Sequence, residues 1–411
     1  MTLADAHARP ASAADFWLFL GGQALSRLGS SFTAFALPLL VFFQTGSALD
    51  LGIATAASML PYLVFGLVLG AWVDRSDRKR LMVATDLGRA AVVATIPLAA
   101  ALGLLSPWWI YAVAFASSTL TIAFEACEFA AMPSLASGSD LTALNGRVQS
   151  SYSIAAVIGP LLAGVLVNLV SAPVVILLDA VTFLVSAWTI GAIRARFNAA
   201  PPGPPSTSVL DDVRAGLRYV LGQPVLRNIA IMMALVNFLA VTANAQLVLF
   251  ATRQLHASST EIAWLYAAES LGMGVLALVV APLRRRLSFA AVALGALAVN
   301  GALIAVFALN PSYPVALVLW ALCGGTGIMF NVAASSLRQD IVPDAMLGRV
   351  MTIASVLAWS TVPAGALVGG VFVDLTGDVV LAYLGIGALM FAIPVGFAFS
   401  SAWKVPLEAR S

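Results

Sequence analysis

The stretch Gly70-Ala71-Trp72-Val73-Asp74-Arg75-Ser76-Asp77-Arg78-Lys79-Arg80 is a short charged segment between two long apolar runs. The run before it, residues 51–73, carries no charged side chain, and the run after it, residues 81–105, carries only Asp86 and Arg89. Apolar runs of this length joined by a short turn are typical of membrane-spanning helices. The four cations of the segment indicate the cytoplasmic side of the membrane under the positive-inside rule.

The composition leads to the same class of protein. Of the 411 residues, 61% are hydrophobic and only 10% are charged, which is too little polar surface to cover a water-soluble globule. An integral membrane protein is therefore expected, and the formal net charge of +2 does not suggest nucleic acid as a partner. The two cysteines, Cys127 and Cys323, lie in separate apolar runs and suggest no disulfide or metal framework.

Runs of about 20 apolar residues predict twelve spans. The first six are expected near residues 16–43, 50–73, 81–104, 107–132, 148–170 and 173–195. The second six are expected near residues 226–252, 260–283, 287–309, 312–337, 349–373 and 379–402. Almost all Lys and Arg residues fall in the loops on the inner side of this arrangement, and Arg253 is the exception on the outer side. This asymmetry predicts that both termini are cytoplasmic.

Two features divide the chain into halves. Residues 198–206 are rich in proline and form a linker, and residues 209–223 after it have the apolar face of an interfacial amphipathic helix. The stretch Leu144-Asn145-Gly146-Arg147-Val148 is repeated as Met346-Leu347-Gly348-Arg349-Val350. The sequence thus predicts an all-α membrane protein with two pseudo-symmetric bundles of six helices. The expected parts are a cytoplasmic N-terminus (1–15), two bundles (16–195 and 226–402), a linker with the amphipathic helix (196–225) and a cytoplasmic C-terminus (403–411).

The charged segment resembles the loop signature of the major facilitator superfamily, Gly-x-Leu-Ala-Asp-Arg-x-Gly-Arg-Lys-x-x-Leu. Trp72, Val73 and Asp77 depart from the pattern. The matching residues are Gly70, Asp74, Arg75, Arg78 and Lys79. The resemblance implies the major facilitator fold and secondary active transport by alternating access, with the substrate site between the two bundles.

Further stretches narrow the resemblance. Residues 23–29, 86–90, 178–183 and 342–350 are similar to the branch that contains macrolide-efflux proteins and siderophore exporters. That branch implies efflux of small molecules across the bacterial inner membrane, driven by proton exchange.

The expected fifth span contains a proline between two glycines, Gly159, Pro160 and Gly164. The proline bends a helix and the glycines let a neighbouring helix approach closely. The stretch 155–164 also resembles the pattern that marks antiporters in this superfamily, with Ala155 and Ala163 in place of two glycines.

Charged side chains inside apolar spans are costly, so each of them is a functional candidate. Asp86 with Arg89, and Glu125 with Glu128, are pairs that share a helix face about two turns from the cytoplasmic end. We expect them to join Asp74 and Arg78 in a neutralised network that latches the cytoplasmic side, with direct proton carriage as the alternative. The complete predicted gate comprises Gly70, Asp74, Arg75, Arg78, Lys79, Asp86, Arg89, Glu125, Glu128 and Arg349.

Three charges lie deeper in their spans. Arg27 and Glu269 fall near the expected midplane of the bilayer, and Asp179 falls nearer the outer face. Glu269 is the best candidate for a carboxylate that alternates between proton and substrate. The alternative is a structural contact of Glu269 with Arg27 or another helix.

Several polar and aromatic side chains are candidates for the lining of the transport pathway, although they would serve equally as hydrogen bonds between helices. They are Gln23, Arg27, Asn237, Asn244, Gln246, Asn331, Trp359 and Ser360. A largely apolar cavity with few charges suits amphipathic solutes better than sugars or ions.

These observations together predict a proton-coupled exporter of amphipathic small molecules. Its expected partners are the solute, protons and membrane lipids, and it is expected to act as a monomer without a cofactor or metal. No Gly-x-x-x-x-Gly-Lys-Ser/Thr segment for binding ATP and no concentrated catalytic constellation occurs in the sequence, so an enzyme is not expected. The alternative function is a proton-coupled importer of a small solute.

Overall fold

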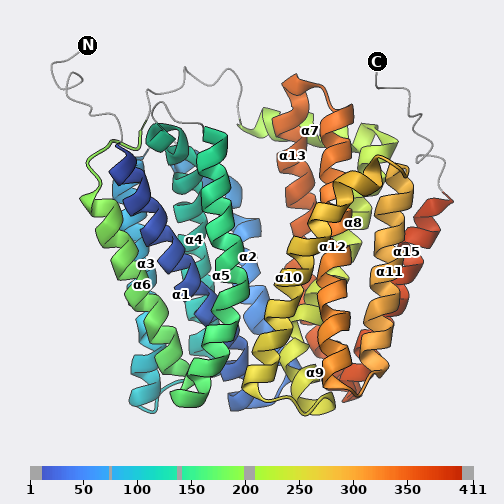
Figure 1. Ribbon diagram of the computed structural model, residues 1–411, viewed down its shortest axis with the longest axis horizontal. Helices are drawn as coiled ribbons and strands as arrows, with labels where there is room; N and C mark the ends of the chain where they lie inside the picture. Colours follow the sequence, from blue (N-terminus) through green and yellow to red (C-terminus); the bar gives the residue numbers. More distant parts are fainter. Residues whose placement is uncertain (1–11, 74–75, 137–140, 199–208, 400–411) are drawn as a thin grey trace. The chain divides into compact units, whose positions relative to one another are not determined.

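The computed structural model describes residues 12–73, 76–136, 141–198 and 209–399 (Figure 1). Within these ranges every regular element is a helix and no strand occurs. Twelve spans of the described chain are long and apolar enough to cross a membrane, which confirms the predicted number. The chain is therefore a multi-pass membrane protein.

The described residues form two compact units. Unit 1 comprises the described residues within Met1–Gly46 and Ala57–Gly203. Unit 2 comprises the described residues within Ser47–Ala56 and Pro204–Ser411. The first six helices are α1 (Ala13–Thr45), α2 (Ala48–Val73), α3 (Arg78–Ala101), α4 (Pro107–Ala136), α5 (Leu141–Leu169) and α6 (Ala172–Ala192). The others are α7 (Val209–Gly222), α8 (Pro224–Ala245), α9 (Leu247–Gln254), α10 (Ser259–Arg284), α11 (Phe289–Leu309), α12 (Tyr313–Ile341), α13 (Asp344–Trp359), α14 (Val362–Thr376) and α15 (Val379–Ala398).

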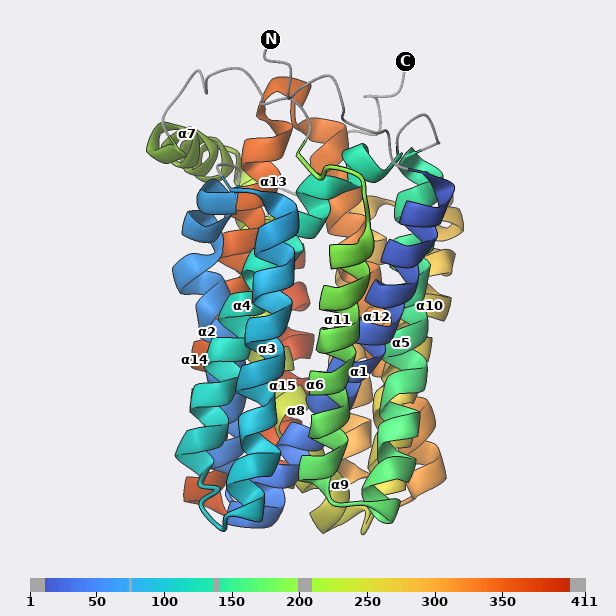
Figure 2. The ribbon, with the colours of Figure 1, turned by 90° about the vertical axis from the view of Figure 1, so that its left-hand side faces the viewer.

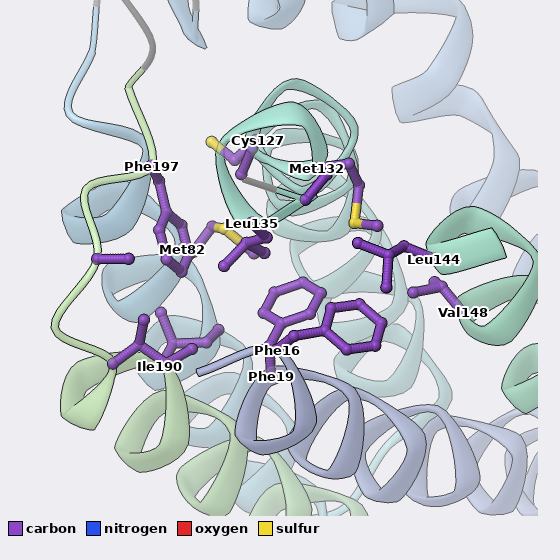
Figure 3. Packing of buried hydrophobic residues seen from close by; sticks show 14 of the residues in the cluster. Phe16, Phe19, Met82, Cys127, Met132, Leu135, Leu144, Val148, Ile190 and Phe197 are labelled. Carbon is purple, nitrogen blue, oxygen red and sulfur yellow. The ribbon is translucent and has the colours of Figure 1, made fainter. Parts of the chain in front are cut away.

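In unit 1, α1 packs against α5 and α6, and α3 packs against α4 and α6. Figure 2 shows α3 and α6 side by side. Near the start of α1, Phe16 and Phe19 join a buried apolar cluster to which α3, α4, α5 and α6 all contribute (Figure 3). The residues labelled there are Phe16, Phe19, Met82, Cys127, Met132, Leu135, Leu144, Val148, Ile190 and Phe197.

The cluster explains why α5 is longer than the sequence predicts. The helix begins at Leu141, whereas the apolar span was expected from residue 148. Leu144 and Val148 are one helical turn apart, and both are buried in the cluster. Because one face of this polar stretch is covered by protein, the helix continues beyond the apolar run.

In unit 2, α10 packs against α12, and α11 packs against α12 and α15. A stack of buried aromatic rings joins α9, α11, α12 and α15. The Phe250 ring centroid lies 4.7 Å from that of Phe307 and 4.6 Å from that of Tyr383, and the Phe307 centroid lies 5.0 Å from that of Trp320. These four rings form a packed core of the unit.

Two predicted spans of unit 2 are each divided into two helices. The span expected at 226–252 consists of α8 and α9, which meet at Gln246, and the span expected at 349–373 consists of α13 and α14. Pro363 stands at the start of α14 and has no backbone N–H to continue the hydrogen-bond ladder of α13. The interruption is held by α8, because Thr361 donates to the Ala234 carbonyl at 2.7 Å.

Two segments differ from their expected setting. The segment Ser47–Ala56 groups with unit 2, although the sequence predicts one bundle for 16–195. There, a Cβ on Gly52 would lie 2.4 Å from the Ala366 carbonyl oxygen, so only glycine permits this close approach. Helix α7 lies where the amphipathic helix was expected, but Val213, Leu217 and Val220 pack in a cluster with residues of α8 and α13. Protein thus covers part of its apolar face.

Candidate functional site

The centre of unit 1 holds an ion cluster that joins α1 to α4. The Arg27 guanidinium donates to Glu125 Oε1 at 2.9 Å and to Glu128 Oε2 at 3.0 Å. The two glutamates are three residues apart on α4, so they present their carboxylates on one face of the helix. The cluster thus places two carboxylates around one guanidinium.

Two tyrosines complete this cluster. Tyr152 of α5 donates its hydroxyl to Glu128, and its ring lies beneath Arg27, with the guanidinium carbon 4.3 Å from the ring centroid. Tyr62 of α2 donates to Glu125 Oε2 at 3.4 Å. Four helices of unit 1 therefore meet at one partly buried guanidinium.

A second ion pair lies within α3. Asp86 and Arg89 are both buried and are bonded to each other. The Arg89 guanidinium carbon lies 4.3 Å from the ring centroids of both Phe124 and Phe183, so it is held between aromatic faces from α4 and α6. This pair is neutral as a whole and fastens three helices together.

The cations of the charged segment hold the ends of neighbouring helices. Arg78 donates to the backbone oxygens of Ala130 at 2.9 Å and Phe197 at 3.4 Å, and Lys79 donates to the backbone oxygen of Ile193. Asp77 caps the N-terminus of α3 through the Arg80 N–H at 3.1 Å. These contacts fix the start of α3 against α4 and against the segment that follows α6.

The described members of the predicted latch make three separate sets of contacts. Glu125 and Glu128 bind Arg27, Asp86 binds Arg89, and the described bonds of the Arg78 guanidinium go to backbone oxygens. Gly70 lies in the last turn of α2, while Asp74 and Arg75 lie outside the described residues. Arg349 lies in α13 of unit 2 and donates to Met346 Sδ at 3.7 Å.

Asp179 of α6 is buried among hydroxyl groups. Its side chain is 2% exposed, and it accepts from Thr33 at 2.5 Å and from Ser30 and Thr182 at 3.4 Å each. Within the described part of unit 1, hydroxyls are its hydrogen-bond partners, and no Lys or Arg lies at ion-pair distance. A carboxyl group in such a setting can hold a proton without breaking an ion pair.

Glu269 of α10 is the corresponding case in unit 2. Trp320 Nε1 donates to its Oε2 at 3.2 Å. With the Asn244 amide oriented so that its nitrogen faces the carboxylate, Asn244 donates to the two oxygens at 3.2 and 3.3 Å. Within the described residues of unit 2, no cation forms an ion pair with Glu269.

The remaining candidates of unit 2 have structural contacts or lie exposed. Asn237 donates to the Ala358 carbonyl at 2.8 Å, next to the interruption between α13 and α14. Asn331 is exposed and donates to the Gly327 carbonyl of its own helix at 3.2 Å. Trp359, at the end of α13, is exposed as well.

The glycine and proline motif of α5 lies where this helix meets α1. A Cβ on Gly159 would lie 2.3 Å from Ser31 Cβ, so only glycine allows this approach. Pro160 lies inside α5, which the structure records as one helix, and both Pro160 and Gly164 are buried.

Three aromatic residues that donate hydrogen bonds to carboxylates of these sites were not expected from the sequence: Tyr62, Tyr152 and Trp320. Each is an aromatic side chain within an apolar span, where such residues more often serve as packing. Their polar ends matter only because a carboxylate from another helix lies opposite, and no local pattern in the sequence reports that.

Comparisons with known proteins agree with this architecture. The family described as transmembrane secretion effector matches residues 9–407. The multidrug efflux pump Tap of Mycolicibacterium fortuitum is 29% identical over 358 residues, which are 85% of this chain and 87% of that protein. Macrolide efflux protein A of Streptococcus pyogenes is 24% identical over 374 residues, covering 88% of this chain and 90% of that protein.

Among solved structures, that of the nucleoside transporter NupG has a TM-score of 0.75 at 12% identity and covers 95% of this chain and 100% of its own. At this identity the likeness concerns the fold alone. The relatives and the fold are those of transporters and not of enzymes. The chain belongs to the transmembrane secretion effector family of the major facilitator superfamily.

Proposed function

We propose that this protein exports amphipathic small molecules from a bacterial cell across the inner membrane, in exchange for protons and by alternating access. Both termini lie in the cytoplasm in this proposal, and the single chain is the working unit. The efflux pumps among its relatives support the direction of transport. The observation that carries the coupling step is the carboxylate of Glu269, whose hydrogen-bond partners among the described residues of unit 2 are the neutral donors Trp320 and Asn244.

The surroundings of Glu269 suit a group that gains and loses charge. Trp320 Nε1 and the Asn244 amide stabilise the carboxylate by hydrogen bonds, yet neither carries a charge that would hold it ionised. A cationic solute or a proton can therefore neutralise this group in turn. Competition of solute and proton for one carboxylate is the simplest basis for exchange, because binding of one displaces the other.

The charges of unit 1 have a different role in this proposal. The Arg27 cluster holds α1 to α4 and positions the pathway-facing part of α1, while Asp86 with Arg89 fastens α3. Asp179 is the second proton candidate, because only hydroxyls of the described unit 1 contact it. An asparagine at position 179 has nearly the same shape and can still hydrogen-bond these hydroxyls. The D179N variant therefore removes the charge while keeping the packing.

The test is transport in everted membrane vesicles with an imposed pH gradient, acidic inside. Ethidium as a lipophilic cation, erythromycin as a macrolide and glucose as a sugar are supplied outside the vesicles. We expect accumulation of ethidium or erythromycin that an uncoupler abolishes, and no accumulation of glucose. Vesicles that contain the D179N or E269Q variant then show which carboxylate the coupling requires.

The opposite result would overturn the proposed direction. Accumulation of a solute in right-side-out vesicles, acidic outside, with none in everted vesicles, is the behaviour of an importer. Accumulation that survives the uncoupler would exclude proton exchange as the driving force.

A further inference from the structure

Two neighbouring hollows lie at the end of unit 1 where α3 begins and α6 ends. The first has a volume of about 600 Å³, and its lining includes Lys79, Arg80, Arg194 and Arg196. The second has a volume of about 430 Å³ and runs along α3 and α6, between Val83, Ala84, Leu87 and Gly191. The two share Asp77, Lys79 and Arg80 as lining residues, so they are continuous at the start of α3.

The first hollow is strongly basic. Four cationic side chains line it against one carboxylate, and that carboxylate, Asp77, already accepts from the Arg80 N–H and lies 3.5 Å from Arg80 Nε. The Lys79 ammonium is held at this place by the Ile193 carbonyl and has two further N–H groups to donate. Arg194 and Arg196 lie in the chain segment after α6. Both are exposed and line the hollow. An anion with several oxygens is the ligand that such a group of donors recognises.

The second hollow is apolar. Val83 and Leu87 are one turn apart on α3, Leu87 is 48% exposed, and Ala84 one turn before it is exposed as well. On the facing helix α6, a Cβ on Gly191 would meet no heavy atom within 4 Å, so the space in front of this glycine is open. A hydrocarbon chain fits the walls of this hollow, whereas a free inorganic anion would make no use of it.

We propose that the two hollows form one binding site for an anionic phospholipid. Its phosphate lies among Lys79, Arg80, Arg194 and Arg196, and one acyl chain lies along α3 and α6 next to Gly191. Basic pockets between membrane helices at the cytoplasmic side are suited to such headgroups. Because the Lys79 ammonium also binds the Ile193 carbonyl just after α6, the lipid strengthens a contact that the protein already makes.

The site is independent of the transported solute and of its direction. It is tested on the full chain by native mass spectrometry after exchange into micelles that contain equal amounts of phosphatidylglycerol and phosphatidylethanolamine. We expect the wild type to retain phosphatidylglycerol preferentially. The R194Q/R196Q variant should lose this retention by about tenfold or more, because each cation near the headgroup accounts for roughly a fivefold change in binding.

A matched control is the R285Q/R286Q variant, which removes the same charge from the exposed end of α10 in unit 2. We expect it to retain phosphatidylglycerol like the wild type. An equal loss of phosphatidylglycerol retention in both variants would mean that the lipid is held only by general attraction between a basic protein and an anionic lipid. That result would contradict a specific site at the two hollows.

The G191L variant separates a lipid from a free anion. The Cβ of the leucine meets no heavy atom within 4 Å, its side chain extends the apolar lining into the hollow, and all four cations stay in place. We expect it to lose phosphatidylglycerol while keeping its melting temperature in phosphatidylethanolamine alone. If G191L retains the lipid, or if inorganic phosphate displaces it at equal concentration, the hollows bind an anion and not a phospholipid.

Discussion

The Arg27 cluster and the Asp86–Arg89 pair of unit 1 are arranged in the opposite way to Glu269 of unit 2. In unit 1, Arg27 contacts two glutamates, and Arg89 is bonded to Asp86. In unit 2, Glu269 has an indole N–H and an amide as partners, and no cation of the described unit pairs with it. Paired charges resist a change of protonation because each stabilises the other, while a carboxylate with neutral donors alone exchanges its proton at less cost.

This contrast teaches that the position of a charge in a membrane span does not define its role. Arg27 and Glu269 both fall near the middle of their spans, yet one is part of a structural cluster and the other is not ion-paired within its unit. The following variants test whether the two arrangements differ in function as they differ in geometry.

The largest effect is expected from R27M. Methionine fills much of the space of the arginine stem but leaves Glu125 and Glu128 without the cation that both contact. Loss of one partner from a buried ion pair costs about 3–5 kcal/mol, and the Glu128 side of this cluster is the buried one. The unfolding temperature in detergent should fall markedly, and the E125Q/E128Q substitutions should restore it in the same chain. An R27M protein that melts like the wild type would contradict a structural role of the cluster.

The E269Q variant is expected to affect transport and not stability. The glutamine oxygen can still accept from Trp320, so the fold keeps its contact, but the side chain no longer carries a proton. Removal of a positioned proton-transfer group lowers rates by about 100-fold or more. The measurement is the initial rate of pH-driven accumulation in everted vesicles. E261Q serves as the control, because Glu261 lies in the first turn of the same helix and bonds to Ser258.

A smaller effect is expected from W320F. The phenyl ring keeps the aromatic packing against Phe307, but the N–H donated to Glu269 is lost. One hydrogen bond contributes about 1 kcal/mol, so the transport rate should change roughly fivefold. Trp264, which is exposed on the same unit, gives the matched control W264F. Equal rates in W320F and the wild type would remove Trp320 from the site.

The smallest effect distinguishes the two glutamates of unit 1. The Glu125 side chain is 37% exposed and that of Glu128 is 8% exposed. An ion pair that solvent reaches contributes at most about 1 kcal/mol, so E125Q should melt close to the wild type. E128Q should melt lower, because Glu128 also accepts from Tyr152. The reverse order of melting temperatures would show that exposure does not govern this cluster.

Local patterns in the sequence predicted the number of spans because hydrophobicity over about 20 residues is a property of each segment alone. They predicted the ends of helices less well where protein covers a polar stretch, as at the start of α5. They also did not predict that two spans are divided, at Gln246 and near Pro363. These interruptions depend on backbone hydrogen bonds and not on hydrophobicity, so hydropathy does not report them.

The sequence by itself determined that this chain crosses the membrane twelve times as a bundle of helices, and that a few charges are placed within the spans. Only the tertiary structure decided which charges pair, since Arg27 and Glu125 are 98 residues apart and Trp320 and Glu269 are 51 apart. The reason is physical: all spans are apolar on most faces, so their neighbours are chosen by close packing at residues such as Gly159 and by the need to satisfy buried polar groups.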